Sequence, residues 1–448
     1  MKQTVVALVK NQTYPDEKRI EEMLDEALHL AGGIESIVKE GAYVVIKGNL
    51  FAPYPPPVSL DRRLLAAFIR ACKKAGAARV VFSEGVSIGT KLGRHTDTKA
   101  ILELLGIRKA VEEAGGECLC LEETERVLAK VPRPISIGEV SYPKAYLDCD
   151  VLVDMCCLKT HTMAYVTLGI KNFQGILIDD EKYYAHRDDL EQKLVDVFKI
   201  RKPDLTIIDG LLAMEGDGAG EDGIAKIMNL IIAGRDVVAV DTVAVQCMGI
   251  EDPLDVAAIR IAAHDGIGTA DRANIEVRGA GIDEVKQKFV LPSSFTKPHD
   301  RWVTGVSDNV EVHIGGACQQ CYLMARGFIK ALSMFRDKQF TLFVGVDPKF
   351  PGRFEGDIDG CIFLGDCACG TAGRLKEIRN RMLIESKGLL APGCPPFRPA
   401  ASMLEGYLFK RGLVDVEAMK AAGAAKTKKI FENYMKLDPS WSPGGSGS

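Results

Sequence analysis

Four cysteines in three separated, glycine-flanked turns constrain the fold of this 448-residue chain more than any other feature. Cys318 and Cys321 form a C-x-x-C in the stretch GGACQQC, Cys367 lies in GDCA, and Cys394 lies in GCPP. Each turn adjoins an apolar run, so core packing explains these cysteines poorly. Four thiolates bind either zinc or an iron-sulfur cluster. Structural zinc sites usually use two short knuckles, whereas two of these cysteines stand alone, and the spacing therefore favours a cluster.

The same constellation resembles the cluster site of nickel-iron hydrogenase small subunits and of the related subunit of respiratory complex I. Those proteins hold one 4Fe-4S cluster with a C-x-x-C near a strand end, a glycine-x-cysteine-alanine turn and a G-C-P-P turn. The cluster ligands that this resemblance implies are Cys318, Cys321, Cys367 and Cys394. The chain departs from the pattern at Cys369, which is an alternative to Cys367, and Cys361 is a further alternative. Zinc and plain structural thiols remain alternatives to the cluster.

The composition is that of an ordinary globular protein, with 47% hydrophobic and 26% charged residues. A chain of this length is expected to build two or more cores. A net charge of -4 and the lack of a basic stripe argue against a nucleic-acid partner. No run of about 18 apolar residues and no secretory signal occur, so neither a membrane span nor export is expected. Thirteen cysteines, an odd number, then predict a cytoplasmic protein, and an exposed cluster suits an anaerobic host.

Apolar strands and amphipathic helices alternate along the chain. Strands at 4–10, 43–50 and 78–85 are separated by helices at 17–33 and 61–76. This rhythm predicts an α/β fold with mostly parallel sheets flanked by helices, and with a second, smaller α/β iron-sulfur block. The predicted organisation is a pocket domain over 1–290, a connector over 291–305, an iron-sulfur domain over 306–435, and a tail over 436–448 that is disordered or a remnant of cloning.

Polar side chains stand at the ends of several consecutive predicted strands. In open parallel sheets, ligands bind outside the carboxyl ends of the strands. The residues at or just beyond these ends are Lys47, Asn49, Ser83, Glu84, Lys159, His161, Asp209, Glu215 and Asp241. One charged residue after a strand is usually a solvated loop or a cap, but its recurrence over consecutive strands predicts a shared polar pocket.

The most distinctive stretch of the first block is 154–177, DMCCLKTHTMAYVTLGIKNFQGIL. Its lysines and its asparagine suit an anionic carboxylate or phosphate, because they form charge-assisted hydrogen bonds. His161 is expected to move a proton, and a metal ligand or a capping histidine are the alternatives. The predicted catalytic residues are His161 and Lys159, and the predicted substrate-binding residues are Lys47, Asn49, Glu84, Lys171, Asn172 and Glu215.

A glycine-rich acidic loop follows the strand that contains Asp209. Glu215 and Asp217 lie among glycines whose backbone folds tightly, and hard carboxylates at this spacing are typical ligands of Mg²⁺ or another divalent cation. A flexible, solvated loop is the more common alternative. No P-loop occurs, and no G-x-G-x-x-G follows the first strand, so nucleotide hydrolysis and a Rossmann dinucleotide site have no sequence support.

The motifs K-T-H and G-I-K-N, together with KGNL, FSEG and IIDGLLAMEGDGAGEDG, resemble the domain-of-unknown-function 362 family over residues 1–285. Members of that family are mostly uncharacterised, and many carry ferredoxin-type cysteines further along the chain. The resemblance therefore implies a redox association. This chain has the dispersed cysteines instead of the compact ferredoxin run.

Together these features predict an iron-sulfur redox enzyme that acts on a small anionic substrate or a second cofactor held in the pocket. A redox partner protein and a homo-oligomer are compatible with this function. One alternative is a non-redox enzyme in which the cluster or an ion acts as a Lewis acid on a hydroxy or carboxylic acid. The other is an electron carrier or maturation partner with no substrate of its own.

Overall fold

The computed structural model describes residues 3–85, 97–177, 181–182, 185–186, 189–296, 303–348, 350, 354, 356–370, 374–394, 397–413 and 416–443. The chain divides into two compact units. Unit 1 contains the described residues up to Pro292 and those from Thr427 onward, and unit 2 contains Ser293–Lys426.

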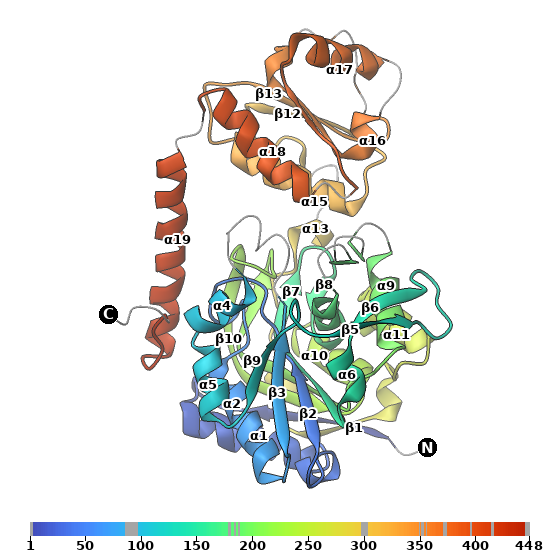
Figure 1. Ribbon diagram of the computed structural model, residues 1–448, viewed down its shortest axis with the longest axis vertical. Coiled ribbons are helices and arrows are strands. Elements are labelled where there is room, and N and C mark those ends of the chain that lie inside the picture. The colour runs from blue at the N-terminus through green and yellow to red at the C-terminus, as the bar shows by residue number, and fades with distance from the viewer. Residues whose placement is uncertain are drawn as a thin grey trace. The chain divides into compact units, whose positions relative to one another are not determined.

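Unit 1 is built on a sheet whose described strands follow the order β11-β1-β10-β9-β7-β2-β3-β4, with β8 paired to β7 (Figure 1). These strands are β1 Thr4–Lys10, β2 Tyr43–Lys47, β3 Arg79–Glu84, β4 Glu117–Cys120, β7 Val151–His161, β8 Tyr165–Thr167, β9 Leu205–Gly216, β10 Gly223–Gly234 and β11 Ile275–Gly279. β9, β7, β2, β3 and β4 are parallel, so their carboxyl ends meet at one edge. β10 runs antiparallel to both β1 and β9.

Helices cover both faces of this sheet (Figure 1). On one face lie α1 Glu17–Leu30, α2 Arg62–Lys74, α4 Thr98–Leu104 and α5 Ile107–Glu113, and on the other α9 Leu190–Phe198, α10 Val237–Cys247 and α11 Ala257–His264. Ala7 and Val9 of β1 pack with the first group, while Val6 and Leu8 point the other way and are equally buried. Burial on both faces explains why the strands are nearly continuous apolar runs.

Smaller elements flank the main sheet. β5 Arg126–Lys130 and β6 Glu139–Pro143 form an antiparallel hairpin, and α6 Lys144–Asp148 follows it. Aspartates begin the two helices nearest the first strands: the side chain of Asp16 accepts the N–H of Arg19 at 2.8 Å, and that of Asp61 accepts the N–H of Arg63 at 2.8 Å. Each carboxylate satisfies a helix N–H that has no intrahelical partner.

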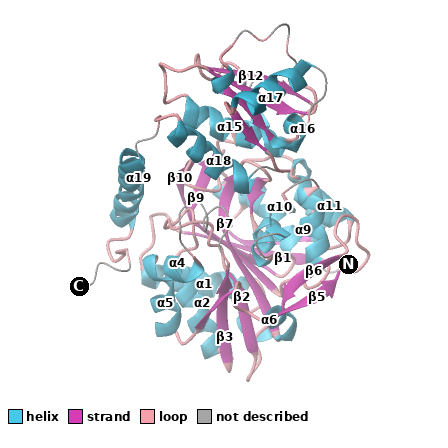
Figure 2. Cartoon of the chain, turned by 45° about the horizontal axis from the view of Figure 1, so that its top comes forward, coloured by secondary structure: helices cyan, strands magenta, loops and turns pink. Residues whose placement is uncertain are grey.

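Unit 2 has a four-stranded parallel sheet in the order β12-β13-β14-β15 (Figure 2). Its strands are β12 Val310–Gly315, β13 Phe340–Gly345, β14 Cys361–Leu364 and β15 Leu389–Ala391. One apolar cluster joins the sheet to α15 Gln319–Leu332 and α18 Phe397–Lys410. A second cluster joins the opposite face to α16 Gly365–Cys369 and α17 Arg374–Glu385. The two units together confirm the predicted α/β class with mostly parallel sheets.

The C-terminal stretch differs from the predicted domain boundaries. Its last helix is α19 Val416–Leu437, and residues from Thr427 onward pack on unit 1 rather than forming a disordered tail. The buried Tyr434 donates its hydroxyl hydrogen to Asp61 at 3.3 Å, and the buried Trp441 donates Nε1–H to the carbonyl of Leu105 at 3.3 Å. These aromatic side chains hold the stretch in place. Residues 444–448, and 297–302 of the predicted connector, lie outside the described residues.

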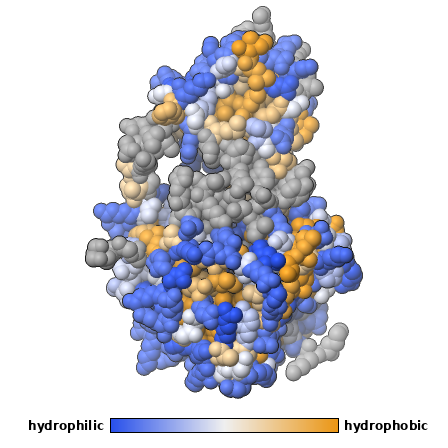
Figure 3. Space-filling view, in the orientation of Figure 1, coloured by the Kyte–Doolittle hydropathy of each residue, from blue (hydrophilic) through white to orange (hydrophobic). Residues whose placement is uncertain are grey.

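On the face seen in Figure 3, hydrophilic residues cover most of unit 1, and apolar residues form separate areas between them. None of the helices in the described ranges has both the length and the apolar character needed to cross a membrane.

Candidate functional site

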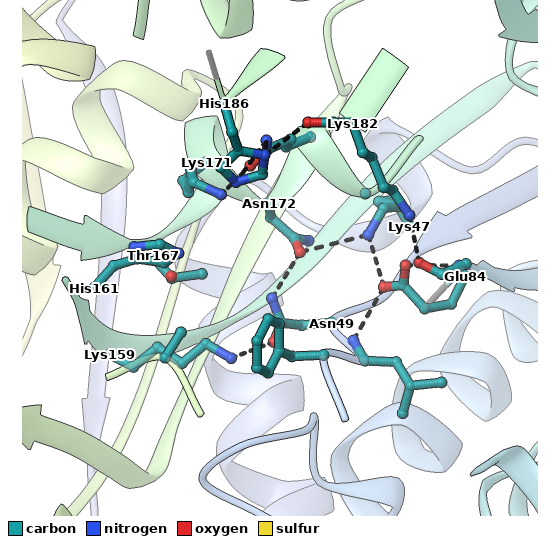
Figure 4. A pocket seen from close by; sticks show the side chains of 16 residues that line it. Lys47, Asn49, Glu84, Lys159, His161, Thr167, Lys171, Asn172, Lys182 and His186 are labelled. Atoms are coloured by element: carbon teal, nitrogen blue, oxygen red, sulfur yellow. Dashed lines mark hydrogen bonds and ion pairs between the residues drawn. The ribbon is translucent and has the colours of Figure 1, made fainter. Parts of the chain in front are cut away.

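The carboxyl ends of the parallel strands in unit 1 surround a pocket of about 110 Å³ (Figure 4). Seven of the eight predicted pocket residues line it: Lys47, Asn49, Glu84, Lys159, His161, Lys171 and Asn172. The remaining described lining residues are Leu50, Phe51, Gly85, Thr167, Gln174, Gly175, Lys182, His186 and Ala219. Strand ends that are far apart in the sequence therefore meet around one cavity large enough for a small molecule.

A buried ion pair forms one wall of the pocket. Lys47 and Glu84 end the neighbouring strands β2 and β3, and Lys47 Nζ lies 2.7 Å from Glu84 Oε2, with both side chains no more than 2% exposed. Lys47 also donates to the carbonyl of Gly48 at 2.7 Å. The Glu84 carboxylate accepts the N–H groups of Leu50 at 3.1 Å and Gly85 at 2.8 Å. The pair is thus fixed by hydrogen bonds on both sides, as a buried charge requires.

Asn172 connects this wall to the rest of the pocket. Its Oδ1 accepts Nδ2–H of Asn49 at 2.7 Å, and its Nδ2 donates to Asp154 Oδ1 at 2.7 Å. Lys159 Nζ donates to Asn49 Oδ1 at 2.7 Å and to the carbonyl of Val58 at 2.8 Å. Each amide oxygen faces a donor, so the orientations of both asparagines are set by the network. Burial lowers the pKa of Lys159.

The pocket has a surplus of positive charge. Asp154, behind Asn172, is fully buried, and its Oδ2 has no hydrogen-bond partner among the described residues. Burial raises the pKa of this carboxyl well above its usual value, which favours the neutral form. The charged side chains that line the pocket are Lys47, Lys159, Lys171, Lys182 and Glu84. Four lysines beside one carboxylate suit an anionic ligand.

A hydrogen-bonded chain orients Lys171, which lies on the short helix α7 Gly169–Asn172. Lys171 Nζ donates to Gln174 Oε1, and Gln174 Nε2 donates to His186 Nε2 at 3.0 Å. His186 Nδ1–H donates to the carbonyl of Lys182 at 2.7 Å, and since a carbonyl only accepts, the ring proton is on Nδ1. Burial lowers the pKa of His186 to about 3 and that of Lys171 to about 7, and neighbouring lysines reinforce the shift of Lys171.

His161 is held as a hydrogen-bond donor toward the pocket. Its Nδ1 accepts the N–H groups of Met163 at 3.0 Å and Ala164 at 3.3 Å. The proton of the neutral ring therefore lies on Nε2, a tautomer assigned from this network. Burial lowers the pKa of His161 well below 6.5, so the ring is neutral near pH 7. In this arrangement Nε2 offers a proton but no lone pair, so the geometry fits a donor and does not fit the metal ligand considered from the sequence.

Thr167 and Gly175 are pocket residues that the sequence reasoning missed. Thr167 lies beside His161 (Figure 4), is 5% exposed, and its Oγ1 has no hydrogen-bond partner among the described residues. An unsatisfied buried hydroxyl costs about 1–3 kcal/mol, and a ligand oxygen in the pocket would offset that cost. A Cβ on Gly175 would lie 2.6 Å from Lys47 Nζ, so a side chain there would displace the ammonium group.

The glycine-rich loop after β9 covers the end of β7. Thr160 Oγ1 donates to the carbonyl of Gly216 at 2.8 Å, and the N–H of Thr162 donates to the carbonyl of Gly218 at 2.9 Å. A Cβ on Gly218 would lie 2.3 Å from the carbonyl oxygen of Thr160, so the close approach requires glycine. The loop thereby brings Ala219 into the pocket wall.

Glu215 was predicted to bind substrate, and the structure corrects this. Its Oε2 lies 2.9 Å from Lys226 Nζ and accepts the N–H of Val290 at 3.0 Å, and the residue is not part of the pocket lining. The neighbouring antiparallel strand β10 supplies Lys226, and this pairing satisfies the carboxylate outside the pocket. The cation site predicted at Glu215 and Asp217 gains no support from this arrangement.

Three other residues that were predicted to end strands position backbone rather than line the pocket. Of these, Ser83 lies at the end of β3, whereas Asp209 is inside β9 and Asp241 is in the helix α10. Ser83 Oγ donates to the carbonyl of Ile46 at 2.9 Å, and Asp209 Oδ2 accepts the N–H of Asp61 at 2.9 Å. Asp241 accepts the first two N–H groups of α7 at 2.8 and 3.0 Å. Burial raises the pKa of both Asp209 and Asp241 to about 7.

In unit 2, the three cysteine-bearing turns follow β12, β14 and β15, at the carboxyl end of the parallel sheet. The second and third turns are joined: the N–H of Asp366 donates to the carbonyl of Gly393 at 3.0 Å, and the N–H of Gly393 donates to Asp366 Oδ1 at 2.7 Å. The first turn meets them at Gly365, where a Cβ would lie 3.2 Å from Cys321 Sγ. Three turns that are distant in sequence are therefore neighbours.

The thiols of these turns influence one another. Cys318 is exposed at the N-cap of α15, and a hydrogen bond from the thiol of Cys321, with nearby backbone N–H groups, lowers its pKa to about 6. The pKa of the buried Cys321 is raised, first by its hydrogen bond to Cys318 and then by burial, with the charges of Cys367 and Cys394 adding to the effect. Cys321 thus lies within electrostatic reach of the three other predicted ligands.

Cys361 and Cys369, the alternative ligands, are directed elsewhere. Cys361 Sγ donates to the carbonyl of Asp357 at 3.6 Å, and Cys369 Sγ donates to that of Phe363 at 3.5 Å. Burial raises their pKa values to about 12 and about 11. Both pack with the α16 and α17 face of the sheet, whereas Cys321 packs with the α15 and α18 face. Within the described ranges, no three His, Cys, Asp or Glu side chains form a group that could hold a metal ion.

Comparison with known proteins supports the pocket half of the chain. Residues 44–246 match the family model described as "Domain of unknown function (DUF362)", as the motifs predicted, and this range contains every described residue that lines the pocket. A thylakoid-associated protein of Synechocystis sp. is 27% identical over 248 residues, which are 53% of this chain and 72% of that protein.

Among solved structures, the lactate racemase apoprotein from Thermoanaerobacterium thermosaccharolyticum matches with a TM-score of 0.36 and 14% identity. The match covers 53% of this chain and 55% of the racemase chain, a little over half of each. A likeness at this level supports no inference about function.

Proposed function

We propose that this protein is an iron-sulfur redox enzyme whose pocket in unit 1 binds a small anionic substrate or a second cofactor. The main support for this proposal is the pocket lining, in which four lysines and one carboxylate surround a cavity of about 110 Å³. A site of this size and charge selects a small anion through charge-assisted hydrogen bonds. Because unit 2 gathers four cysteines at its own strand ends, a redox role is the function that accounts for both regions.

Within the pocket, the described residues have different roles in binding the anion. Lys47 is committed to Glu84 and sets a fixed charge in the wall. Lys159 supplies an ammonium group toward the anion, Lys171 supplies an amine that is only partly protonated near pH 7, and His161 supplies Nε2–H. The unsatisfied Oγ1 of Thr167 adds a hydroxyl beside His161. These groups bind and orient the anion, and the neutral His161 hydrogen-bonds to an oxygen on which negative charge develops, as donors in oxyanion sites do.

We propose that the cysteine turns of unit 2 hold a 4Fe-4S cluster. A thiolate is the ligating form of cysteine. A cluster takes one cysteine for each iron, so its four ligands stand around a cage rather than around one atom. The orientation of Cys361 and Cys369 favours Cys318, Cys321, Cys367 and Cys394 as the ligands, the same set that the hydrogenase resemblance implies. When bound, such a cluster supplies single-electron transfer.

The proposed cellular setting is the cytoplasm of an anaerobe. Reduced thiols and an exposed cluster persist in the reducing cytoplasm of an anaerobe. A redox partner protein would deliver or accept the electron.

Iron and acid-labile sulfide content of anaerobically purified protein tests the cluster. Ser substitutions at the four proposed ligands, Cys318, Cys321, Cys367 and Cys394, are expected to remove most of the iron. Cys361→Ser and Cys369→Ser are matched controls in the same unit and are expected to keep it. Wild-type protein that contains zinc in place of iron and sulfide would refute the redox function.

Isothermal titration with oxalate tests the anion pocket separately. Lys159→Gln is expected to weaken binding about tenfold, which corresponds to roughly 1.4 kcal/mol. Lys226→Gln, a lysine outside the pocket that pairs with Glu215, is the control and is expected to bind oxalate as the wild type does. Equal loss in both variants would mean that oxalate binds by general charge and not in this pocket.

A further inference from the structure

We propose that Lys171 forms an imine with the carbonyl carbon of a small 2-oxo acid bound in the pocket. The inference rests on the proposed anion pocket, and it names the substrate class that the pocket takes. It does not depend on the cluster in unit 2.

The four lysines of the pocket have different partners. Lys47 pairs with a carboxylate at 2.7 Å, and Lys159 donates to two acceptors at 2.7 and 2.8 Å. Lys182 donates to the carbonyl of Gly85 at 2.8 Å. Lys171 has the amide oxygen of Gln174 as its one hydrogen-bond partner among the described residues, with no described carboxylate in ion-pair contact. The ammonium form of Lys171 therefore has one neutral hydrogen-bond acceptor among the described residues, and the charge of the nearby Glu191 only partly offsets its burial.

The surroundings of Lys171 hold its nitrogen in a defined place. The Gln174 amide cannot turn its NH₂ group to Lys171, because that group is bound to His186, whose Nδ1–H is in turn bound to the carbonyl of Lys182. The helix that carries Lys171 is fixed at its start by Asp241. A nucleophile needs this kind of positioning.

Burial and neighbouring lysines lower the pKa of Lys171 to about 7. Lysines that are desolvated or placed near other cations are known to serve as nucleophiles toward carbonyl compounds. At pH 7.5 such a lysine has roughly several hundredfold more neutral amine than a lysine with the ordinary pKa of about 10.4. The shift agrees with the role that the geometry indicates.

The reaction requires no external oxidant or reductant. The amine lone pair of Lys171 attacks the carbonyl carbon, the carbon-oxygen π bond breaks, and one proton of the amine passes to that oxygen, giving a carbinolamine. Loss of the hydroxyl group and the second amine proton as water then forms the carbon-nitrogen double bond. His161 Nε2–H is a donor in the same pocket that stabilises the carbinolamine oxygen. Lys159 supplies the charge that holds the carboxylate of the 2-oxo acid.

Reductive trapping tests the proposal. The full-length protein is incubated at pH 7.5 with pyruvate and sodium cyanoborohydride, which reduces an imine to a stable secondary amine, and the modified lysine is located by peptide mass spectrometry. We expect the adduct on Lys171 to exceed that on the exposed Lys109 in the same sample by at least about tenfold, because far more of the Lys171 amine is neutral. Methyl pyruvate, which has no carboxylate, is expected to label Lys171 much less.

One variant and a pH series complete the test. Lys171→Arg keeps the charge but removes the nucleophile, and is expected to abolish selective trapping. If that variant does not fold, the pH profile of trapping in the wild type decides, with the rate at Lys171 rising through about pH 7. Labelling no greater than at Lys109, or an adduct that maps to Lys159 or Lys182, would overturn the proposal. If the wild-type protein does not bind oxalate, the anion pocket itself is refuted.

Discussion

The two strand-end sites of this molecule are built in opposite ways. In unit 1, the polar side chains of the pocket hydrogen-bond to one another: Lys47 to Glu84, Asn49 to Asn172, and Lys159 to Asn49. In unit 2, backbone and Asp366 contacts join two of the cysteine turns, while Cys318 and Cys367 are exposed. Among the described residues, side-chain hydrogen bonds therefore organise the pocket, whereas backbone and Asp366 contacts join the cysteine turns.

The two sites should therefore respond differently to their ligands. A site whose polar groups are already paired binds its ligand without rearrangement. Its energetic cost lies in the folded protein, which keeps charged side chains away from water. If the cysteine turns hold the proposed cluster, their site gains much of its order from that cluster, since metal binding and folding are coupled. Substitutions in unit 1 should therefore change stability, and substitutions in unit 2 should change metal content.

The largest effect is expected for Lys47→Met, which leaves the buried Glu84 carboxylate without its counter-ion. Breaking a buried pair by removing one partner costs about 3–5 kcal/mol of unfolding free energy. Urea denaturation measures this loss. The double variant Lys47→Met with Glu84→Gln is the control and should recover part of the stability, because no unpaired charge remains. A loss below about 1 kcal/mol in the single variant would show that the pair is not sealed from water.

In unit 2, Asp366→Ala is expected to lower iron affinity about 10- to 100-fold, the range typical of residues that support metal ligands. The substitution removes the acceptor for the N–H of Gly393 at 2.7 Å, so one of the two hydrogen bonds between the second and third turns is lost and the backbone bond at 3.0 Å remains. Asp366→Asn keeps Oδ1 and should retain iron. Iron content after dialysis against a graded chelator series makes the comparison, and equal retention in both variants would contradict the role of this contact.

Anion binding should depend on pH through Lys171, whose pKa is lowered to about 7. As pH falls from 8 to 6 the amine gains a proton, so the pocket gains positive charge and oxalate binds more tightly, by on the order of tenfold. Oxalate titrations across this range measure the dependence. Lys171→Met should remove it. Binding that tightens as pH rises would contradict the assignment.

The smallest effect is expected for Thr167→Val. The hydroxyl has no partner among the described residues, so its removal should raise the free energy of unfolding by about 1 kcal/mol, the lower end of the cost of an unsatisfied buried hydroxyl. Oxalate affinity should fall by a few fold, since the ligand loses a hydrogen bond of about 0.5–1.5 kcal/mol. Thr167→Ser keeps the hydroxyl and is the control. An affinity of Thr167→Val equal to the wild type would place the hydroxyl away from the ligand.

The α/β class and most of the pocket were predictable because both depend on local sequence. Lys47, Glu84 and Lys159 stand at the ends of apolar strands, and parallel strands bring such ends to one edge. His161 was also found this way, but its tautomer depends on the N–H groups of Met163 and Ala164, which only the folded turn presents.

Other features could not be found because they depend on contacts between distant segments. Lys182 and His186 line the pocket from a stretch whose sequence has no strand pattern. Thr167 is one of several polar residues in its stretch, and its sequence context does not distinguish it as a pocket residue. Glu215 was wrongly predicted to bind substrate because its ion-pair partner, Lys226, is on the antiparallel strand β10 and could not be identified from the sequence. Trp441 is a large aromatic residue in a C-terminal stretch that also contains Pro and Ser. An aromatic residue in such a stretch indicates that the stretch packs against the protein, and Trp441 is buried.

Amide hydrogen exchange of anaerobically purified protein, before and after iron is removed by a chelator, tests the contrast between the two sites most directly. We predict that protection falls in segments 316–321, 365–369 and 392–394, and that segments 43–50 and 159–172 of the pocket keep theirs. Protein that contains no iron, or equal changes in both sets of segments, would contradict the account.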